Sequence, residues 1–229
     1  MISAIVLAGG AGKRMNSDVS KQYMELAGKP VLHHSIAAFD SHDEIGEIVV
    51  VIRKGEEELF EREIFSKQQF RKNIKIVRGG DERSDSVRNG ISILDSKSEM
   101  VLVHDGARPF LDKSIIDHNI SGCRTYGACV TAVPSKDTVK IVSSSGEIVE
   151  TPDRNTVFLA QTPQTFKTEI VAEALKSVQE EGLAITDDSM AVESLGVKVQ
   201  IVEGSYENIK LTTPEDMAVG EIIARKRGC

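Results

Sequence analysis

A glycine-rich turn followed by clustered cations lies near the start of the chain. The apolar run Ile5–Leu7 leads into three glycines, and three basic residues follow within a few positions. Because glycine has no side chain to hold a ligand away, its backbone N–H groups can point at anionic oxygens, and the cations supply charge for a reacting triphosphate. The turn therefore predicts a phosphate site made of Ala8, Gly9, Gly10, Gly12, Lys13, Arg14 and Lys21.

Two commoner glycine motifs do not match this turn. A P-loop would need glycine where Leu7 stands and serine or threonine where Arg14 stands. A dinucleotide fingerprint would need glycine in place of Met15, and an acidic residue after the next strand, where Arg53 stands. A plain strand-to-helix turn that uses glycine for geometry alone remains the alternative.

A second glycine pair, Gly79-Gly80, precedes a segment rich in Asp and Ser. One interpretation is structural, because this composition is typical of the capped start of a helix. The other is functional: the backbone of Gly80, the neighbouring Asp81 and the hydroxyl of Ser86 would bind a base and a ribose. Capping and recognition can coexist, so this motif alone does not decide between them.

Asp105 and Arg108 follow a strand that reads as buried. A carboxylate at the end of a strand suits magnesium, a hard cation that prefers carboxylate, water and phosphate oxygens. A structural Asp105–Arg108 ion pair is the alternative. His104 is expected to be a structural histidine, because a magnesium–triphosphate site does not require a base.

Polar residues in later loops suit a phosphorylated substrate: Thr162, Thr186, Lys210 and Thr212. Each is weak evidence taken singly. Thr186 could cap a helix over 187–194, and the proline and acidic residues after Thr212 are typical of a helix start.

Short β-branched runs alternate with stretches of helical spacing, which predicts an α/β fold with one doubly wound, mostly parallel sheet. The loops with the polar residues described above then fall at the carboxyl ends of strands, where such sheets bind ligands. The strands are expected at Ile2–Leu7, Ile48–Ile52, Ile74–Val77, Met100–His104, Ala128–Val133 and Val197–Val202, and the helices at Val31–Phe39, Glu56–Phe65, Asp85–Leu94 and Ser114–Arg124.

Residues 136–159 break this rhythm. Two β-rich stretches flank Ser143–Gly146, which has the composition of a hairpin turn. The segment has too few large apolar residues to stand alone, so we expect a projecting arm that docks on a second copy of the chain. An edge hairpin packed on its own domain is the alternative.

The composition is that of a single globular domain of 229 residues, 40% of them hydrophobic. A net charge of −7, from 28 basic and 35 acidic residues, disfavours a nucleic acid or an anionic membrane as the main partner. Three cysteines without C-x-x-C spacing favour free thiols, with Cys129 in the core. The chain has no apolar run of about 18 residues and no targeting stretch, so we expect a cytoplasmic protein.

Eight motifs occur in one order over nearly the whole chain: LAGGAGKRM, KQY, GGDERSDSV, VHDGARPF, PSKDTVK, DRNTVFLAQTPQTF, ITDD and ENIKLTTPEDM. In this combination the sequence closely resembles the 2-C-methyl-D-erythritol 4-phosphate cytidylyltransferases of the non-mevalonate isoprenoid pathway. The resemblance implies a Rossmann-like nucleotidyltransferase fold and magnesium-dependent transfer of CMP from CTP to methylerythritol phosphate, with release of pyrophosphate. It also implies a homodimer interlocked through the arm.

The resemblance also assigns roles by position. Arg14 and Lys21 match the pair that stabilises charge on the α-phosphate, and Asp105 matches the metal-binding carboxylate. The nucleotide pocket is matched by Gly10, Gly12, Gly80, Asp81 and Ser86. The acceptor side is matched by Asp105, Arg108, Thr138, Arg154, Thr162, Thr186, Lys210 and Thr212, with Thr138 and Arg154 on the arm and expected to face the partner's site. The chain departs from the common pattern at Gly9 and Gly106, and neither difference removes a functional group.

Two other functions remain open from the sequence. A ribitol-5-phosphate cytidylyltransferase would share the fold, the glycine turn and the Gln-Thr-Pro-Gln run, although PSKDTVK and ITDD side with the methylerythritol enzymes. A catalytically silent nucleotide-binding regulator is the other, and the intact set of Arg14, Lys21 and Asp105 speaks against it.

Overall fold

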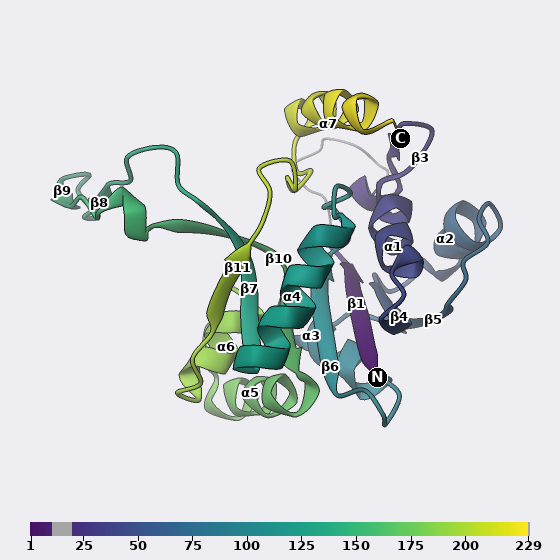
Figure 1. Cartoon of the computed structure of the whole chain (residues 1–229), viewed down its shortest axis with the longest axis horizontal. Coiled ribbons are helices and arrows are strands. Elements are labelled where there is room, and N and C mark those ends of the chain that lie inside the picture. The colour runs from purple at the N-terminus through teal and green to yellow at the C-terminus, as the bar shows by residue number, and fades with distance from the viewer. Residues whose placement is uncertain (11–19, 229) are drawn as a thin grey trace.

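The computed structural model describes residues 1–10 and 20–228, so the predictions for Gly12, Lys13 and Arg14 lie outside the described residues. A seven-stranded sheet runs through the middle of the molecule in the order β11-β7-β10-β6-β1-β4-β5 (Figure 1). Its strands are β1 (Ile2–Ala8), β4 (Ile45–Ile52), β5 (Asn73–Arg78), β6 (Met100–Asp105), β7 (Ala128–Pro134), β10 (Phe158–Lys167) and β11 (Gln200–Glu203).

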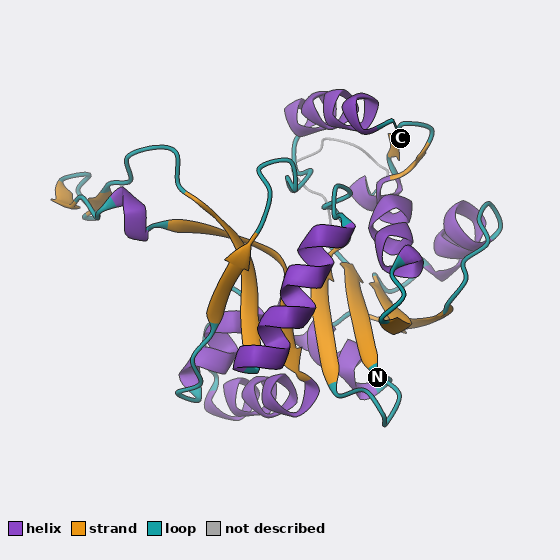
Figure 2. Cartoon of the chain, in the orientation of Figure 1, coloured by secondary structure: helices purple, strands orange, loops and turns teal. Residues whose placement is uncertain are grey.

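The sheet is parallel except at one strand. β10 runs antiparallel to both of its neighbours, β6 and β7, while every other neighbouring pair is parallel. Helices cover both faces of the sheet (Figure 2). The predicted α/β fold with a doubly wound, mostly parallel sheet is therefore confirmed.

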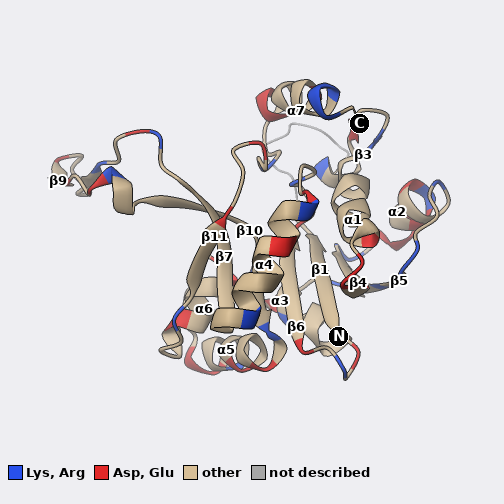
Figure 3. Cartoon of the chain, in the orientation of Figure 1, with Lys and Arg blue, Asp and Glu red and all other residues tan. Residues whose placement is uncertain are grey.

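Each face of the sheet has its own apolar cluster, because successive side chains of a strand point to opposite faces. In β1, Ala4 and Val6 join the cluster on one face, whereas Ile5 joins the cluster on the other. Most Lys, Arg, Asp and Glu residues lie on loops and on the outer sides of helices (Figure 3). The helices are α1 (Val31–Ser41) and α4 (Lys113–Tyr126) on one face, and α3 (Arg83–Ser92), α5 (Thr168–Glu181) and α6 (Asp188–Ser194) on the other.

A third, smaller cluster supports the upper edge of the sheet. There α7 (Pro214–Arg227) packs on the ribbon formed by β2 (Glu25–Leu26) and β3 (Lys29–Pro30). Thr213 caps α7 by accepting the N–H of Asp216 at 3.3 Å, and proline follows at the first helical position. This cluster holds the segment before α7, which carries Lys210, against the body of the protein.

β10 is a strand that the sequence analysis did not predict. Its buried side chains are largely polar and Pro163 interrupts its pairing, and both features disguise a central strand. The polar groups are satisfied inside the protein: the Thr165 hydroxyl donates to Asn119 Oδ1 at 2.9 Å, and the Gln164 amide donates to Asp187 Oδ2 at 2.8 Å. Because these bonds replace those to water, a polar strand can lie in the centre of the sheet.

Three other predictions of elements were wrong or incomplete. Helix α5 was not predicted, although Val171, Leu175 and Val178 have helical spacing and are buried. The expected strand at Val197–Val202 is shorter and begins only at Gln200. The expected helix over 56–65 is divided into α2 (Glu57–Phe60) and a π-helical turn, η3 (Glu61–Phe65).

Residues 136–157, which we call the arm, extend away from the sheet (Figure 1). They contain an antiparallel pair of short strands, β8 (Ile141–Val142) and β9 (Ile148–Glu150), and the 3-10 turn η4 (Arg154–Thr156). The two residues at the end of the expected arm, 158–159, pair with β7 as part of β10. Ile148 is 62% exposed and Val149 69% exposed, so these side chains are not packed on their own chain.

Two further expectations concern the cysteines and membranes. Cys123 and Cys129 are free and fully buried, so the core position predicted for Cys129 is confirmed.

Among the helices in residues 1–10 and 20–228, none combines the length and the apolar character that a membrane crossing requires.

Candidate active site

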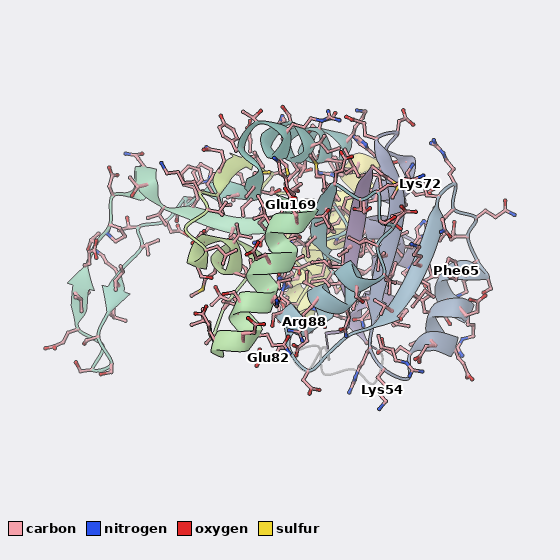
Figure 4. The ribbon with its side chains drawn as sticks, turned by 90° about the horizontal axis from the view of Figure 1, so that it is seen from below. Lys54, Phe65, Lys72, Glu82, Arg88 and Glu169 are labelled. Carbon is pink, nitrogen blue, oxygen red and sulfur yellow. The ribbon has the colours of Figure 1, made fainter. Side chains whose placement is uncertain are left out.

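A pocket of about 710 Å³ lies at the carboxyl ends of four adjacent strands, β5, β4, β1 and β6. Its size suits a small-molecule ligand. Lys54, after β4, and Glu82, after β5, both line it and lie at the same edge of the molecule (Figure 4). The pocket brings together these residues predicted from the sequence: Ala8, Gly9, Gly10, Lys21, Gly80, Asp81, Ser86, Asp105 and Lys210.

The described lining of this pocket is locally cationic. Lys21, Arg53, Lys54, Arg83 and Lys210 contribute five positive side chains against the three carboxylates of Asp81, Glu82 and Asp105. The protein as a whole carries a charge of −7. The positive excess is therefore a property of this pocket, and it favours an anionic ligand.

Lys21 lies in the 3-10 turn η2 (Lys21–Tyr23), beside the end of β1. The side-chain amide of the next residue, Gln22, donates to the carbonyl oxygen of Ala8 at 2.5 Å. This bond joins the turn directly to the last residue of β1, so Lys21 and the first glycines belong to one local structure.

The Gly79-Gly80 turn is shaped by close contacts with α3. A Cβ at Gly80 would lie 2.2 Å from the Cβ of Asp85, and a Cβ at Gly79 would lie 2.8 Å from the Ser86 hydroxyl. That hydroxyl accepts the N–H of Gly80 and donates to the carbonyl of Glu82, both at 3.1 Å. The helix-start interpretation is therefore borne out geometrically, while one lone pair of the Ser86 hydroxyl remains for a ligand.

Asp105 lies at the centre of a group of three cations. Its Oδ2 is 2.9 Å from Lys210 Nζ and 3.5 Å from Arg108 Nε, and its Oδ1 is 3.8 Å from Arg83 Nε. Burial would raise the pKa of Asp105, but the charges of Lys210, Arg83 and Arg108 together lower that pKa well below its usual range. The carboxylate therefore stays ionised, and the Asp105–Arg108 pair considered from the sequence is present.

His104 and Thr162 form a hydrogen-bonded pair that fixes the backbone of Asp105. The Thr162 hydroxyl accepts the N–H of Asp105 at 3.0 Å and lies 3.0 Å from His104 Nδ1. Burial lowers the pKa of His104 to about 4, so its ring is neutral. Because the carbonyl of Arg108 can only accept, the ring proton is assigned to Nε2, which donates to that carbonyl at 3.1 Å, and Nδ1 then accepts the proton of the Thr162 hydroxyl. His104 is structural, as expected, and the hydroxyl of Thr162 is used within the protein.

Hydrogen bonds before and after Lys210 in the sequence fix its loop. Asn208 is fully buried, and its amide donates to the carbonyl of Thr162 at 2.9 Å. Leu211 donates its N–H to the carbonyl of Ala107 at 2.8 Å. These bonds fix the loop that places the Lys210 ammonium beside Asp105.

Sequence reasoning missed three cations of the pocket. Arg83 lies within the second glycine motif, and its Nη1 is 2.6 Å from Oδ1 of the fully buried Asp188. It thereby connects the ITDD motif to Asp105. Arg53 and Lys54 directly follow β4, and the strand-end rule that found Asp105 could have found them as well.

Several residues predicted for the acceptor side lie outside the described lining of the pocket. Thr138 and Arg154 are exposed on the arm. Thr186 is exposed before α6, whose N-cap is Asp187 rather than Thr186. The Thr212 hydroxyl donates to Asp216 Oδ2 at 2.8 Å, which ties it to the start of α7. Arg108 and Thr162 are also absent from this lining, and both contact Asp105, which belongs to it.

Comparisons with known proteins match nearly the whole chain to one family. Residues 2–226 match the family described as 2-C-methyl-D-erythritol 4-phosphate cytidylyltransferase. The proteins of that name from Caldanaerobacter subterraneus and Clostridioides difficile are 46% and 47% identical to this chain, over 98% and 97% of it and 99% and 93% of their own lengths.

Solved structures give the same result. The 4-diphosphocytidyl-2C-methyl-D-erythritol synthase of Anaerococcus prevotii superposes with a TM-score of 0.88 at 36% identity, covering 98% of this chain and 96% of its own. The 2-C-methyl-D-erythritol 4-phosphate cytidylyltransferase of Thermus thermophilus superposes with a TM-score of 0.78 at 27% identity, covering 96% and 98%. The chain belongs to the 2-C-methyl-D-erythritol 4-phosphate cytidylyltransferase family.

Proposed function

We propose that this protein transfers CMP from CTP to 2-C-methyl-D-erythritol 4-phosphate. An oxygen of the acceptor phosphate attacks the α-phosphorus of CTP and forms a new P–O bond. The bond from the α-phosphorus to the oxygen that bridges to the β-phosphorus breaks, and pyrophosphate leaves with that electron pair. The products are 4-diphosphocytidyl-2-C-methyl-D-erythritol and pyrophosphate.

The protein has no proton to remove in this reaction, because the attacking phosphate is already anionic. The barrier is the repulsion between two anions, and positioned cations lower it. Lys21 is our candidate for stabilising charge on the α-phosphate, together with Arg14. The location of Lys21 beside Ala8, Gly9 and Gly10 in one pocket supports its role.

The nucleotide is proposed to bind between the two glycine turns. Gly10, Gly12 and Lys13 would hold the triphosphate, and Gly80, Asp81 and Ser86 would contact the base and ribose. The location of Gly80, Asp81 and Ser86 in the same pocket as Gly10 supports this assignment.

The acceptor is proposed to bind on the Lys210 side of Asp105. Lys210 is 40% exposed at its side chain, so its ammonium can contact both Asp105 and an incoming phosphate. Arg108 would hold Asp105 in place for this contact. Thr162, Thr186 and Thr212 are assigned to the acceptor side by the family resemblance alone. Thr138 and Arg154 would be supplied by the arm of a second copy in a homodimer.

Magnesium is the cofactor that fits this donor set. The described residues contain no group of three or more His, Cys, Asp or Glu side chains that could hold a metal by themselves. Magnesium is commonly held by one or two carboxylates together with substrate phosphates, and Asp105 Oδ1 is the less engaged oxygen of its carboxylate. When bound there, the ion would neutralise phosphate charge during the reaction.

One observation carries the proposal. Lys21, Asp105 and Lys210 come from three distant segments, yet they line one pocket with the glycine turns. This is the arrangement that charge-stabilised phosphoryl chemistry requires, and it occurs in a chain of this family.

Pyrophosphate release by the purified protein with CTP and magnesium tests the proposal. Parallel reactions would contain methylerythritol phosphate, ribitol 5-phosphate or no acceptor, and Lys21→Ala would serve as the inactive control. We expect release with methylerythritol phosphate. Release only with ribitol 5-phosphate would overturn the acceptor assignment, and no release with either would overturn the catalytic function.

A further inference from the structure

Three consecutive glutamates, Glu56, Glu57 and Glu58, follow Gly55 but lie in different environments. Glu58 is exposed, and Glu57 is partly exposed and pairs with Arg78. Glu56 is only 9% exposed. A buried carboxylate is costly unless its oxygens are hydrogen-bonded, so the partners of Glu56 indicate what it does.

Both oxygens of the Glu56 carboxylate bind neighbours of Lys21. The Ser20 hydroxyl donates to Oε1 at 2.5 Å, and the Gln22 amide donates to Oε2 at 3.3 Å. The same amide of Gln22 donates to the carbonyl of Ala8. One buried carboxylate therefore fixes the residues immediately before and after Lys21.

The charge of Glu56 also affects Tyr23, the last residue of the turn. Burial, and then the charge of Glu56, raises the pKa of the Tyr23 hydroxyl well above its usual value. Tyr23 is 7% exposed in the core beside α1. The turn that carries Lys21 is thus packed on one side and bound to a carboxylate on the other.

Glu56 is itself held firmly. Its N–H donates to the carbonyl of Arg53 at 3.1 Å, at the end of β4, and its carbonyl accepts the N–H of Phe60 at 2.8 Å. Phe60 is fully buried. Glu56 therefore connects the Lys21 turn to β4, the strand beside β1 in the sheet.

The chemistry of these contacts requires a carboxylate. Ser20 and Gln22 both donate, so their common partner must accept at two atoms. A glutamine at position 56 would accept at its oxygen but present N–H groups at its other terminal atom. Glu56→Gln would therefore keep the size of the side chain and lose one of the two anchors of the turn.

We propose that Glu56 is a positioning residue that holds Lys21 at the reacting phosphate, an inference that rests on the proposed function. Glu56 acts through Ser20 and Gln22 and does not itself line the described pocket. A displacement of about 1 Å in a reacting group can cost on the order of 10²-fold in rate, so two hydrogen bonds are enough to matter.

The test compares Glu56→Gln with Glu58→Gln, which makes the same charge change on an exposed residue two positions away. For both variants kcat and the KM for CTP are measured in the pyrophosphate assay. We expect Glu56→Gln to lower kcat about tenfold or more with little change in the KM, since Lys21 matters most when charge develops. Glu58→Gln should match the unaltered protein.

A double-mutant cycle distinguishes positioning from a general structural role. If Glu56 acts through Lys21, adding Glu56→Gln to Lys21→Ala should cause little further loss of kcat. A further loss as large as that in the single variant would overturn the proposal. Thermal unfolding and CTP binding by calorimetry establish that each variant is folded.

Hydrogen exchange provides a readout that does not depend on turnover. The N–H groups of Tyr23 and Met24 donate to the carbonyls of Ser20 and Lys21 within the turn. Their exchange should accelerate in Glu56→Gln and not in Glu58→Gln. If the unaltered protein is active and the two variants are indistinguishable, this inference alone fails; if the unaltered protein is inactive, the proposed function fails and takes the inference with it.

Discussion

The pocket and the arm differ in how far their side chains find partners within the chain. In the pocket, Asp105 contacts three cations, and each is fixed by buried neighbours such as Asn208 or Asp188. On the arm, Ile148 and Val149 point their apolar side chains into solvent. The pocket is built within one chain, whereas the arm carries apolar side chains that its own chain leaves exposed.

Local physics favours a partner for the arm. Strands of two and three residues joined by a tight turn are marginal in water without further packing. Exposed apolar side chains gathered on one projection mark an interaction surface. A second copy is the partner we propose, because an interlocked dimer would also bring Thr138 and Arg154 to a neighbouring site.

The largest expected effect lies in the pocket. Lys21→Ala should lower kcat by about 10²–10³-fold while changing CTP affinity much less, because a cation aimed at developing charge acts mainly in the transition state. Steady-state kinetics and calorimetric CTP binding measure the two quantities. Equal losses in both would contradict a transition-state role.

The free energy of unfolding should depend much more on the sheet beneath the pocket than on the arm. Leu102 is fully buried in the sheet, so Leu102→Ala should lower the free energy of unfolding by about 2–5 kcal/mol. Val149→Ala on the arm should change it by less than about 0.5 kcal/mol. Chemical denaturation of both variants under conditions that keep the protein monomeric provides the measurement. A large loss for Val149→Ala would mean that the arm packs on its own chain.

Asp105→Asn should raise the magnesium concentration needed for half-maximal activity, by about tenfold or more, because a neutral amide is a poorer ligand for a hard divalent ion. The variant also removes the negative charge between Lys210, Arg83 and Arg108. A magnesium titration of pyrophosphate release is the measurement. If the curve overlays that of the unaltered protein, Asp105 does not hold the ion.

A charged residue on the arm should weaken association. Val149→Asp places a carboxylate on the apolar surface that we expect to be covered in the dimer, and burying an unpaired charge is costly. Sedimentation should show a larger monomer fraction than for Val149→Ala at the same concentration. An unchanged distribution would exclude this part of the arm from the interface.

The parts that the sequence could predict follow local rules. The pocket was found because parallel strands place their carboxyl ends at one edge, so Gly9, Lys21 and Asp105 could be assigned to one place before their contacts were known. The Asp105–Lys210 pair spans 105 residues in the chain, and only the resemblance linked the two.

Other parts follow from tertiary structure alone. The sequence of β10 is polar and therefore resembles a loop. It forms a central strand because Gln164 and Thr165 bond to residues of α4 and of the start of α6, which are distant in sequence. Glu56 cannot be told from Glu57 and Glu58 in the sequence, since its burial depends on how β4 meets the Lys21 turn. The residues of the arm likewise do not identify a partner by themselves.

Mixing Lys21→Ala with Arg154→Ala tests the shared site most directly. The acceptor concentration should saturate the unaltered protein but not the Arg154→Ala variant. After subunit exchange, a heterodimer would contain one site with both substitutions and one with neither, so random exchange should restore about a quarter of the unaltered activity. If heterodimers form and the mixture is no more active than its components, Arg154 acts within its own chain and the account of a site completed by the arm is wrong.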